Sequence, residues 1–134
     1  MRQLQLVSEG DARGAAALYA PACLNHGRPV DREDIARIFE SIVALHEQFT
    51  IQEIIGEGDW VACRAIVTGK HATKPDIPVG GGVYSMAQPT GKEYSIQHIH
   101  LYKVVDGMIV EHWANRDDLG AARQLGLELG PKAP

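Results

Sequence analysis

Five residues near the C-terminal end of the chain have side chains that could exchange protons or bind a polar ligand: His98, His100, Trp113, Asn115 and Asp117. They lie in or beside two β-rich runs separated by an Asp-Gly pair, the preferred pair of a two-residue type I′ turn. Residues directly opposed across such a hairpin share one face of the sheet. Counted from the turn, His100 faces Trp113 and His98 faces Asn115, and Asp117 joins them if the strand continues. We therefore expect a polar cluster with an aromatic wall on one face of the hairpin.

Such a cluster suggests acid–base chemistry. Burying these groups costs about 1 to 3 kcal/mol for each one left unpaired, so they must pair with one another or face a cavity. In an apolar cavity, desolvation and a nearby imidazolium act on an aspartate in opposite directions, which makes Asp117 a candidate for proton exchange near neutral pH. We expect His100 to orient Asp117 or to hold an enolate oxygen. The alternatives are a satisfied buried hydrogen-bond network, or Asp117 and Asp118 capping the helix that follows.

The same residues also suggest a metal site as an alternative. The His98-x-His100 spacing places two imidazoles on one face of a strand, a geometry that can chelate zinc or iron. A third ligand is missing there, because Glu111 lies near the hairpin end and His112 points to the other face. The chain also lacks a glycine-rich phosphate fingerprint, a serine nucleophile elbow and a convincing cysteine-histidine pair. We expect neither a metal nor a cofactor.

The rest of the chain supplies the elements that position these residues. A helix is predicted to begin at Asp31, which can cap it, and its apolar residues recur at helical spacing: Ile35, Ile38, Phe39, Ile42, Leu45 and Phe49. A shorter alanine-rich helix covers residues 12–19 and stops near Pro21. Residues 50–56 and 60–68 flank a turn and form a second hairpin. Residues 70–92 are rich in proline and glycine and form a loop, either functional or a surface excursion.

We therefore predict one α+β domain over residues 1–134, in which N-terminal helices pack on a strongly curved antiparallel sheet that encloses an internal pocket. The more apolar face of the last hairpin also needs burial, and it consists of Gln97, Ile99, Leu101, Val105, Met108, Val110, His112 and Ala114. Helices cover only one side of the sheet in so small a chain. We expect the other side to be buried in a homodimer or a higher homo-oligomer.

Composition excludes several classes of protein. The chain has 134 residues, 45% hydrophobic content and a net charge of −4 with no basic run, so we expect no nucleic acid and no membrane as a partner. No signal peptide opens the sequence, and no apolar run approaches the ~20 residues of a membrane span. Cys23 and Cys63 lie in apolar contexts without redox or metal spacing, which is typical of buried thiols. We expect a cytoplasmic protein with a small-molecule substrate.

Several short strings resemble one known family. They are Leu24-Asn25-His26-Gly27, Gly58-Asp59-Trp60-Val61-Ala62-Cys63-Arg64, Thr68-Gly69-Lys70-His71, Pro89-Thr90-Gly91-Lys92, Asp106-Gly107-Met108-Ile109-Val110-Glu111-His112-Trp113, Asp117, and Gln124-Leu125-Gly126. In this order they resemble the SnoaL-like polyketide cyclases of the nuclear-transport-factor-like cone superfamily, over nearly the whole chain. The resemblance implies an α+β cone with a deep pocket. It also implies a cofactor-free intramolecular aldol closure of a polyketide ester.

The resemblance also implies which residues form the site. The acid–base aspartate that follows the tryptophan in the family matches Asp117, the histidine of the preceding strand matches His100, and the histidine of the early Asn-His string matches His26. Two departures, a short first helix and a long stretch between Gly69 and Thr90, imply a reshaped pocket mouth and a different substrate.

Together these lines predict a cofactor-independent acid–base enzyme acting on a small, largely apolar carbonyl substrate, with Asp117 and His100 as catalytic residues. The expected substrate-binding residues are His26, Phe39, Arg64, His98, Trp113 and Asn115. For Arg64, an ordinary salt bridge at the sheet edge is the alternative. Two other functions stay open: epoxide hydrolysis or epoxide-opening cyclisation in the same pocket, and a non-catalytic module for ligand binding or dimerisation.

Overall fold

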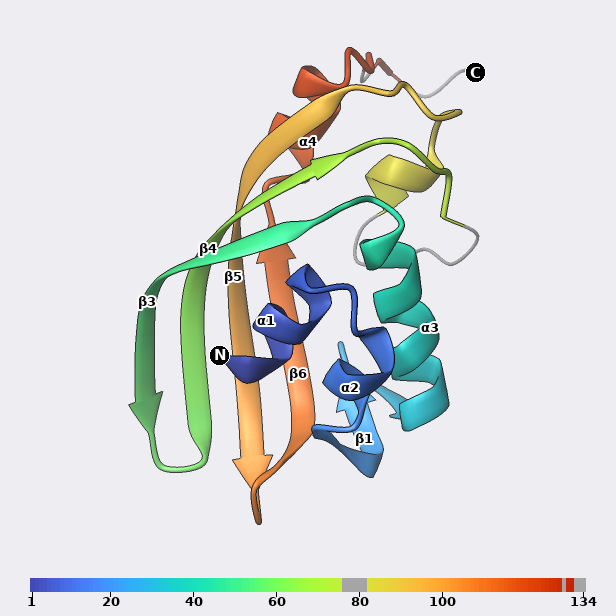
Figure 1. Cartoon of the computed structure of the whole chain (residues 1–134). Helices are drawn as coiled ribbons and strands as arrows, with labels where there is room; N and C mark the ends of the chain where they lie inside the picture. Colours follow the sequence, from blue (N-terminus) through green and yellow to red (C-terminus); the bar gives the residue numbers. More distant parts are fainter. Residues whose placement is uncertain (76–81, 129, 132–134) are drawn as a thin grey trace.

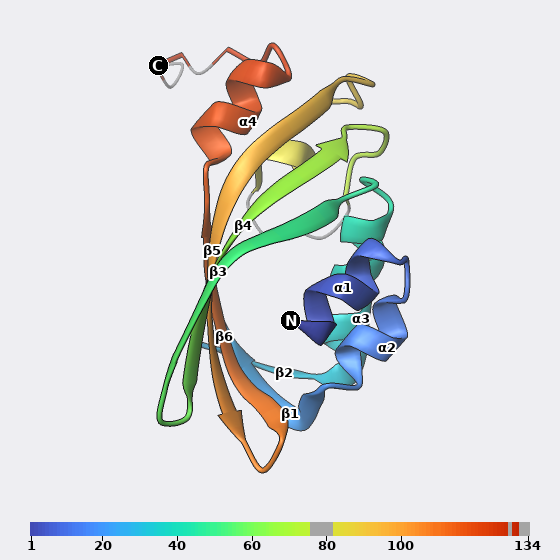
Figure 2. The ribbon, with the colours of Figure 1, turned by 60° about the vertical axis from the view of Figure 1, so that its left-hand side comes forward.

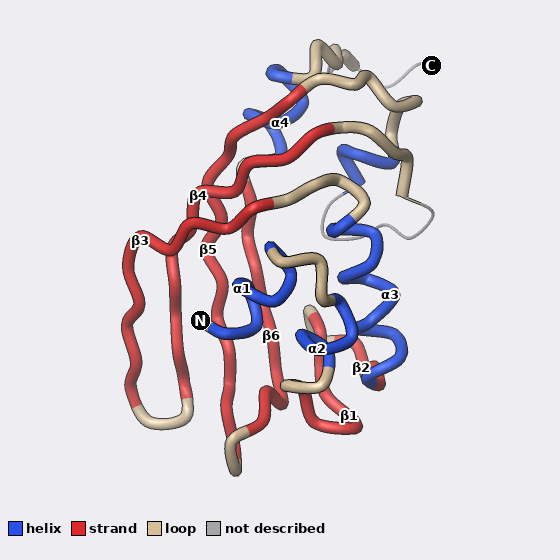
Figure 3. Tube along the Cα trace, viewed as in Figure 1, coloured by secondary structure: helices blue, strands red, loops and turns tan. Residues whose placement is uncertain are grey.

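A six-stranded, strongly curved sheet wraps around helices that lie on its concave face (Figure 2). The computed structural model describes residues 1–75, 82–128 and 130–131. Most of its elements are labelled in Figure 1, β2 is labelled in Figure 2, and Figure 3 colours them by type. In chain order they are α1 (Arg2–Ser8), α2 (Ala12–Ala16), β1 (Tyr19–Asn25), β2 (Arg28–Asp31), α3 (Arg32–Val43), β3 (Gln48–Glu57), β4 (Trp60–Lys70), η1 (Gly82–Ser85), β5 (Glu93–Val105), β6 (Met108–Arg116) and α4 (Asp118–Gln124).

The strand order across the sheet is β2-β1-β6-β5-β4-β3. Neighbouring strands are antiparallel except β1 and β6, which run parallel. The sheet does not close on itself, and α1, α2 and α3 fill its concave side (Figure 2). The predicted α+β architecture, with helices packed on a curved sheet, is confirmed.

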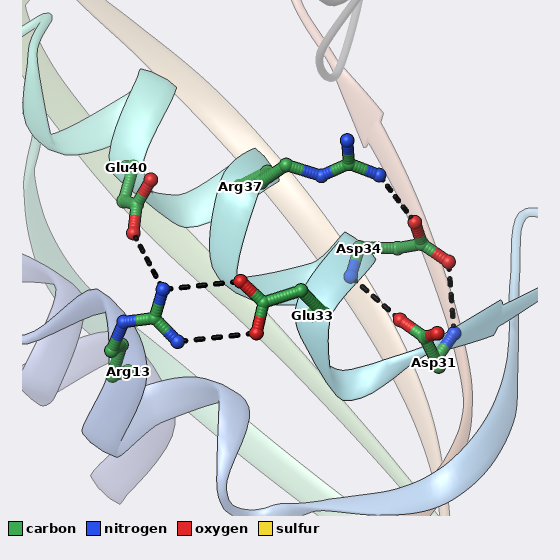
Figure 4. A network of polar contacts seen from close by, with 6 residues as sticks. All are labelled: Arg13, Asp31, Glu33, Asp34, Arg37 and Glu40. Carbon is green, nitrogen blue, oxygen red and sulfur yellow. Dashed lines mark hydrogen bonds and ion pairs between the residues drawn. The ribbon is translucent and has the colours of Figure 1, made fainter.

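The predicted helix α3 begins where its cap was expected. Asp31 and Asp34 form a capping box, in which the Asp31 carboxylate accepts from the Asp34 backbone N–H at 2.8 Å and the Asp34 carboxylate accepts from the Asp31 N–H at 3.0 Å (Figure 4). Arg13 of α2 donates to Glu33 at 3.1 and 3.2 Å and lies 3.8 Å from Glu40. These contacts fix the start of α3 and tie it to α2.

Other boundaries differ from the sequence prediction. Helix α3 ends at Val43, and Phe49, the last residue of the predicted apolar repeat, lies on β3. The helix predicted over residues 12–19 stops at Ala16, and a strand that the sequence did not suggest begins at Tyr19. This strand contains Pro21, which has no N–H to donate, and its ladder with β6 is interrupted between Tyr19 and Leu24.

The stretch predicted as a loop over residues 70–92 contains one short element, the 3₁₀ helix η1. Residues 76–81, which include Pro78 and two of the three consecutive glycines, lie outside the described residues. His71 is fully buried beside this element: Thr90 N–H donates to its Nδ1 at 3.2 Å, so its Nε2–H donates to the Tyr84 carbonyl at 2.9 Å. This histidine anchors η1 to the end of β4.

The hairpin that carries the predicted site turns where expected but changes register soon afterwards. Asp106 and Gly107 have φ of 50° and 75°, as a type I′ turn requires, and the first predicted pair beside the turn is present. Val110 is then an extra residue on β6, because the residues on either side of it pair with consecutive residues of β5. This β-bulge adds one residue to one strand, so every later side chain of β6 changes face.

The predicted face is therefore wrong for β6. His100 pairs with Ala114 instead of Trp113, and His98 pairs with Arg116 instead of Asn115. The indole and the carboxamide consequently lie on the outer face of the sheet, and His112, Ala114 and Arg116 face the helices. The predicted pairs are wrong because counting residues from the turn assumes an unbroken ladder. A β-bulge cannot be recognised from the alternation of residue types along the strand.

Two groups of buried residues hold the fold together. The larger group packs α1, α2 and α3 onto the sheet and includes Leu4, Ile35, Phe39 and Tyr102. The smaller group joins α4, η1 and β5 at the other end of the sheet. No helix among the described residues is both long and apolar enough to cross a membrane.

Candidate active site

A cavity of about 820 Å³ lies between the concave face of the sheet and the helices α1 and α3. Its helix wall is mostly apolar and includes Ile35, Ile38, Phe39 and Ile42 of α3, with Asp34 and Arg37 as its charged members. Its sheet wall is polar and includes His98, His100, His112 and Arg116 of β5 and β6. A cavity of this size with a few convergent polar groups is typical of small-molecule sites. The structure thus places a pocket where the sequence predicted one, with a different set of side chains from β6.

Three histidines form a continuous hydrogen-bonded chain along this wall. Nδ1 of His98 lies 3.2 Å from Nε2 of His100, and Nδ1 of His100 lies 2.9 Å from Nε2 of His112. The chain ends at Asn25, whose Oδ1 is 2.9 Å from Nδ1 of His112. Tyr102 packs against this histidine chain: its ring stacks on the rings of His100 and His112 at centroid distances of 5.8 and 4.8 Å.

Burial keeps these imidazoles neutral. Desolvation lowers the pKa of His100 to about 4 and also lowers the pKa values of His98 and His112 far below the ordinary value. A neutral imidazole has one donor and one acceptor nitrogen. With Oδ1 of Asn25 as the terminal acceptor, each Nδ1–H in turn donates to the next residue. The chain therefore has a direction, and the Nε2 lone pair of His98 is left at its free end.

This free end is a buried acceptor without a partner. His98 is 3% exposed, lines the cavity, and its Nε2 has no hydrogen-bond partner among the described residues. Phe49 of β3 packs its ring edge-on against His98 at a centroid distance of 5.7 Å. An unpaired acceptor in such a place costs about 1 to 3 kcal/mol unless a ligand or a water satisfies it. The arrangement can accept a hydrogen bond from a hydroxyl or an enol of a bound molecule.

A buried carboxyl that sequence reasoning missed also lines the cavity. Glu47 lies between α3 and β3, is 4% exposed, and accepts a hydrogen bond from the Tyr94 hydroxyl at 2.8 Å. Burial raises the pKa of this carboxyl to about 7, and the Tyr94 hydrogen bond and the Arg116 charge offset only part of the effect. In the sequence Glu47 is a single acidic residue at a helix-to-strand junction. No motif or periodicity marks such a position.

Asp117 occupies a different place from the one predicted. Its side chain is exposed, is not part of the cavity wall, and accepts from the Gly120 backbone N–H at 2.9 Å as the N-cap of α4. Asp11 makes the same contact with Gly14 at 2.8 Å as the N-cap of α2. Both caps belong to an Asp-x-x-Gly-Ala-Ala string, and this repeated string is the sequence signal that indicates a helix N-cap at Asp117. The predicted position of Asp117 in the cavity is therefore wrong, and its catalytic role stays a prediction.

The other predicted site residues divide between the two faces of the sheet. His26 and Phe39 line the cavity, and the His26 ring meets the His112 ring edge-on at a centroid distance of 5.6 Å. Trp113 lies on the outer face and donates through Nε1 to Glu111 at 2.9 Å. Asn115 and Arg64 also point outward. Arg64 donates to both carboxylate oxygens of Glu53 at 2.6 and 2.7 Å, which is the salt bridge considered as its alternative.

The histidines do not converge on a common point. Their ring nitrogens face one another along the chain instead of surrounding a central position. Within residues 1–75, 82–128 and 130–131, no three histidine, cysteine, aspartate or glutamate side chains gather closely enough to hold one metal ion.

Both the sequence and the structure of this chain are similar to those of known proteins. Residues 1–125 match the SnoaL-like polyketide cyclase family. Nogalonic acid methyl ester cyclase of Streptomyces nogalater is 30% identical over 109 residues, which cover 79% of this chain and 75% of that protein. Aklanonic acid methyl ester cyclase DnrD of Streptomyces peucetius is 35% identical over 85 residues, 62% of this chain and 52% of that protein.

Solved structures share the fold. TsrD from Streptomyces laurentii superposes with a TM-score of 0.74 at 23% identity, covering 92% of this chain and 88% of that one. IdmH from Streptomyces antibioticus superposes with a TM-score of 0.70 at 28% identity, covering 92% of each chain. The family match spans nearly the whole sequence, and these neighbours have the same helices on a curved sheet. The family predicted from the short strings is confirmed, and the chain belongs to the SnoaL-like polyketide cyclases.

Proposed function

We propose that this chain is a cofactor-independent enzyme that closes a ring in a small, largely apolar polyketide ester by an intramolecular aldol reaction. One observation carries the proposal: a cavity of about 820 Å³ with a mostly apolar helix wall, lined on the sheet side by a directed chain of neutral histidines whose last acceptor, Nε2 of His98, is buried and unpaired among the described residues. The names of relatives in the family add support, because they are cyclases of nogalonic and aklanonic acid methyl esters.

The reaction is an isomerisation and needs no external reagent. A C–H bond α to a carbonyl breaks, the resulting enolate carbon bonds to a second carbonyl carbon of the same molecule, and the second oxygen receives a proton. The site must therefore orient an enolisable carbonyl, accept and return one proton, and exclude water. His98 accepts a hydrogen bond from the enol hydroxyl, and His100 holds the ring of His98 in place. The apolar wall of α3 binds the carbon skeleton.

Turnover of nogalonic acid methyl ester and aklanonic acid methyl ester tests the proposal. The expected product has the mass of the substrate and one additional ring, whereas epoxide hydrolysis would add the mass of water. His100→Leu breaks the chain at its centre while nearly preserving volume, and we expect kcat/KM to fall about 100-fold. Glu93→Gln, at an exposed position in the same strand and outside the cavity, is the control. A mass-neutral cyclised product that forms equally fast with His100→Leu would contradict the role of the chain.

The resemblance assigns the proton transfer to a second candidate, Asp117. Replacement by Asn preserves a good N-cap and removes the titrating group. Loss of about 100-fold in kcat with Asp117→Asn, at unchanged thermal stability, would support Asp117 as the acid–base residue. Unchanged kcat leaves the buried groups of the cavity as the proton carriers.

We also propose that two copies of the chain pair through the outer face of the sheet. This face exposes large apolar side chains that helices do not cover: Leu24, Ile55, Ile99, Leu101 and Trp113. A two-fold axis would bring the same patch together from both copies, and Arg64 with Glu53 supplies self-complementary charges beside it. Light scattering should give twice the chain mass, and Leu101→Lys should reduce it to one chain mass. A wild-type protein that is monomeric at high concentration would refute the pairing.

A further inference from the structure

Glu47 sits at a part of the cavity wall built from four separate elements. Tyr94 of β5, Tyr84 of η1 and Arg116 of β6 surround it, and Asp118 at the start of α4 adds a second carboxylate nearby. The Tyr84 and Tyr94 rings stack at a centroid distance of 4.8 Å and are 2% and 3% exposed. The family resemblance did not assign any of these residues.

The contacts of Glu47 leave part of its carboxyl open to the cavity. Tyr94 donates to Oε1, while Oε2 accepts no hydrogen bond from the described residues. A structural carboxylate in so buried a place is normally paired with a cation in contact or held by several donors. Here the one hydroxyl donor and the neighbouring charge of Arg116 do not restore the ordinary pKa. A carboxyl that changes protonation near neutral pH, with one oxygen facing an apolar cavity, has the properties of a general base.

Arg116 complements this carboxyl. Its side chain is 13% exposed and lines the cavity, and one of its N–H groups donates to Asp118 at 3.3 Å. A guanidinium has five N–H donors in a planar fork, so the single bond to Asp118 leaves donors for an oxygen in the cavity. Its charge lowers the pKa values of both Glu47 and His98, and Arg116 pairs directly with His98 across the β5–β6 ladder, so the guanidinium is near both groups.

We propose that Glu47 is the base that removes the proton α to the substrate carbonyl, and that Arg116 binds the enolate oxygen formed in that step. The assignment rests on the proposed aldol function. The C–H electron pair becomes the enolate, the proton moves to Oε2 of Glu47, and the new C–C bond forms at a second carbonyl. The alkoxide then takes the proton back from Glu47, so the carboxylate is regenerated and no atom is gained or lost.

Gly69 supports the assignment from the neighbouring strand. A side chain at this position of β4 would collide with the Tyr94 hydroxyl, so glycine there makes room for the hydroxyl that donates to Glu47. Tyr94→Phe and Gly69→Ala both disturb one hydrogen bond to the carboxylate and leave the carboxyl itself in place. Each should raise the pKa of Glu47, because the hydrogen bond favours the charged form.

The test compares Glu47→Gln with Glu57→Gln, an exposed glutamate in the β3–β4 turn region, on the two methyl esters named above. We expect Glu47→Gln to lower kcat at least 100-fold with little change in KM and to remove the acid limb of the pH profile, while Glu57→Gln retains the wild-type profile. Tyr94→Phe should retain measurable kcat with the acid limb moved to higher pH. A Glu47→Gln enzyme with wild-type kcat and pH profile would overturn the assignment, as would an unmoved limb in Tyr94→Phe.

A second measurement needs no substrate. Carbon-13 NMR of glutamate-labelled protein should show one carboxyl, absent from the Glu47→Gln spectrum, that titrates near neutral pH. A Glu47 carboxyl that titrates in the ordinary acidic range would overturn its role as the base even if the esters are cyclised. Near-neutral titration without turnover of either ester would instead refute the proposed reaction while confirming the poised carboxyl.

Discussion

The two faces of the β5–β6 hairpin differ in residue type and have opposite roles. The inner face presents a chain of imidazoles to a cavity, with every ring nitrogen but one engaged in a hydrogen bond. The outer face presents Ile99, Leu101 and Trp113, each more than a third exposed. A single extra residue, Val110, decides which side chains of β6 belong to which face. The identity of a site residue on a strand therefore depends on register as much as on residue type.

The largest effect should come from placing a charge on the inner face of β6. Ala114 pairs with buried His100 and lines the cavity, whereas Asn115 is exposed on the outer face. We expect Ala114→Lys to lower the free energy of unfolding by about 4 kcal/mol, because it buries an unpaired cation, and Asn115→Lys to change it by less than about 0.5 kcal/mol. Urea unfolding measures both changes. Equal losses in the two variants would show that the bulge does not set the faces.

The next effect concerns pH and separates the carboxyl from the imidazoles of the inner face. The folded-state pKa of Glu47 is raised from 4.5 to about 7, so its stabilising contribution is complete below pH 4.5 and is lost as the pH rises through 7. That loss amounts to about 3 kcal/mol for a fully buried group. The buried histidines act in the opposite direction, because their depressed pKa values give stability that disappears as the pH falls.

Urea unfolding at pH 5 and pH 8 should therefore respond differently to two variants. Between pH 5 and pH 8 the wild type loses stability because the buried Glu47 carboxyl ionises. Glu47→Gln has no group to ionise there, so the free energy of unfolding of the variant should rise relative to that of the wild type as the pH rises. Glu57→Gln should follow the wild type. If Glu47→Gln and the wild type show the same pH dependence, the carboxyl does not titrate in this range.

A smaller effect should distinguish neighbouring residues on the two faces of β6. His112→Leu removes the link between His100 and Asn25, so the chain loses its fixed direction, and kcat should fall about 100-fold, equivalent to about 2.7 kcal/mol. Asn115→Ala changes an exposed side chain on the outer face and should leave kcat unchanged. Steady-state kinetics on the same ester measures both. Activity lost with Asn115→Ala and kept with His112→Leu would reverse the assignment of the faces.

The smallest effect compares the two aspartate caps. Asp11→Ala and Asp117→Ala each remove one side-chain acceptor from a short helix, and each should lower the free energy of unfolding by about 1 kcal/mol. Thermal unfolding measures the two losses side by side. Equal losses, with the corresponding Asn variants close to the wild type, would show that both residues act as caps. A much larger loss of activity than of stability at Asp117 would show a second role there.

Several local signals in the sequence predict the structure correctly, whereas features that depend on long-range contacts are not predicted. The cap at Asp31, the Asp-Gly turn and the family strings each depend on a few adjacent residues, and all three are confirmed. The bulge depends on how β6 is held between β5 and β1, and the strand β1 was itself hidden by Pro21. Glu47 becomes special only through burial by side chains far away in the chain, such as Tyr94. Local spacing carries no information about such contacts.

The cavity owes its shape and its chemistry to different parts of the chain. Helix α3 supplies most of the aliphatic and aromatic lining, while the histidines and Arg116 lie on strands whose backbones pair in ladders, and Glu47 lies next to the first residue of β3. Substitutions such as Ile38→Val or Ile42→Ala would enlarge the cavity without disturbing any strand pairing. The size of the substrate that fits the cavity can therefore change during evolution, or be changed by engineering, while the reactive groups keep their positions. Divergent members of one family could in this way accept differently shaped polyketides with a shared reaction.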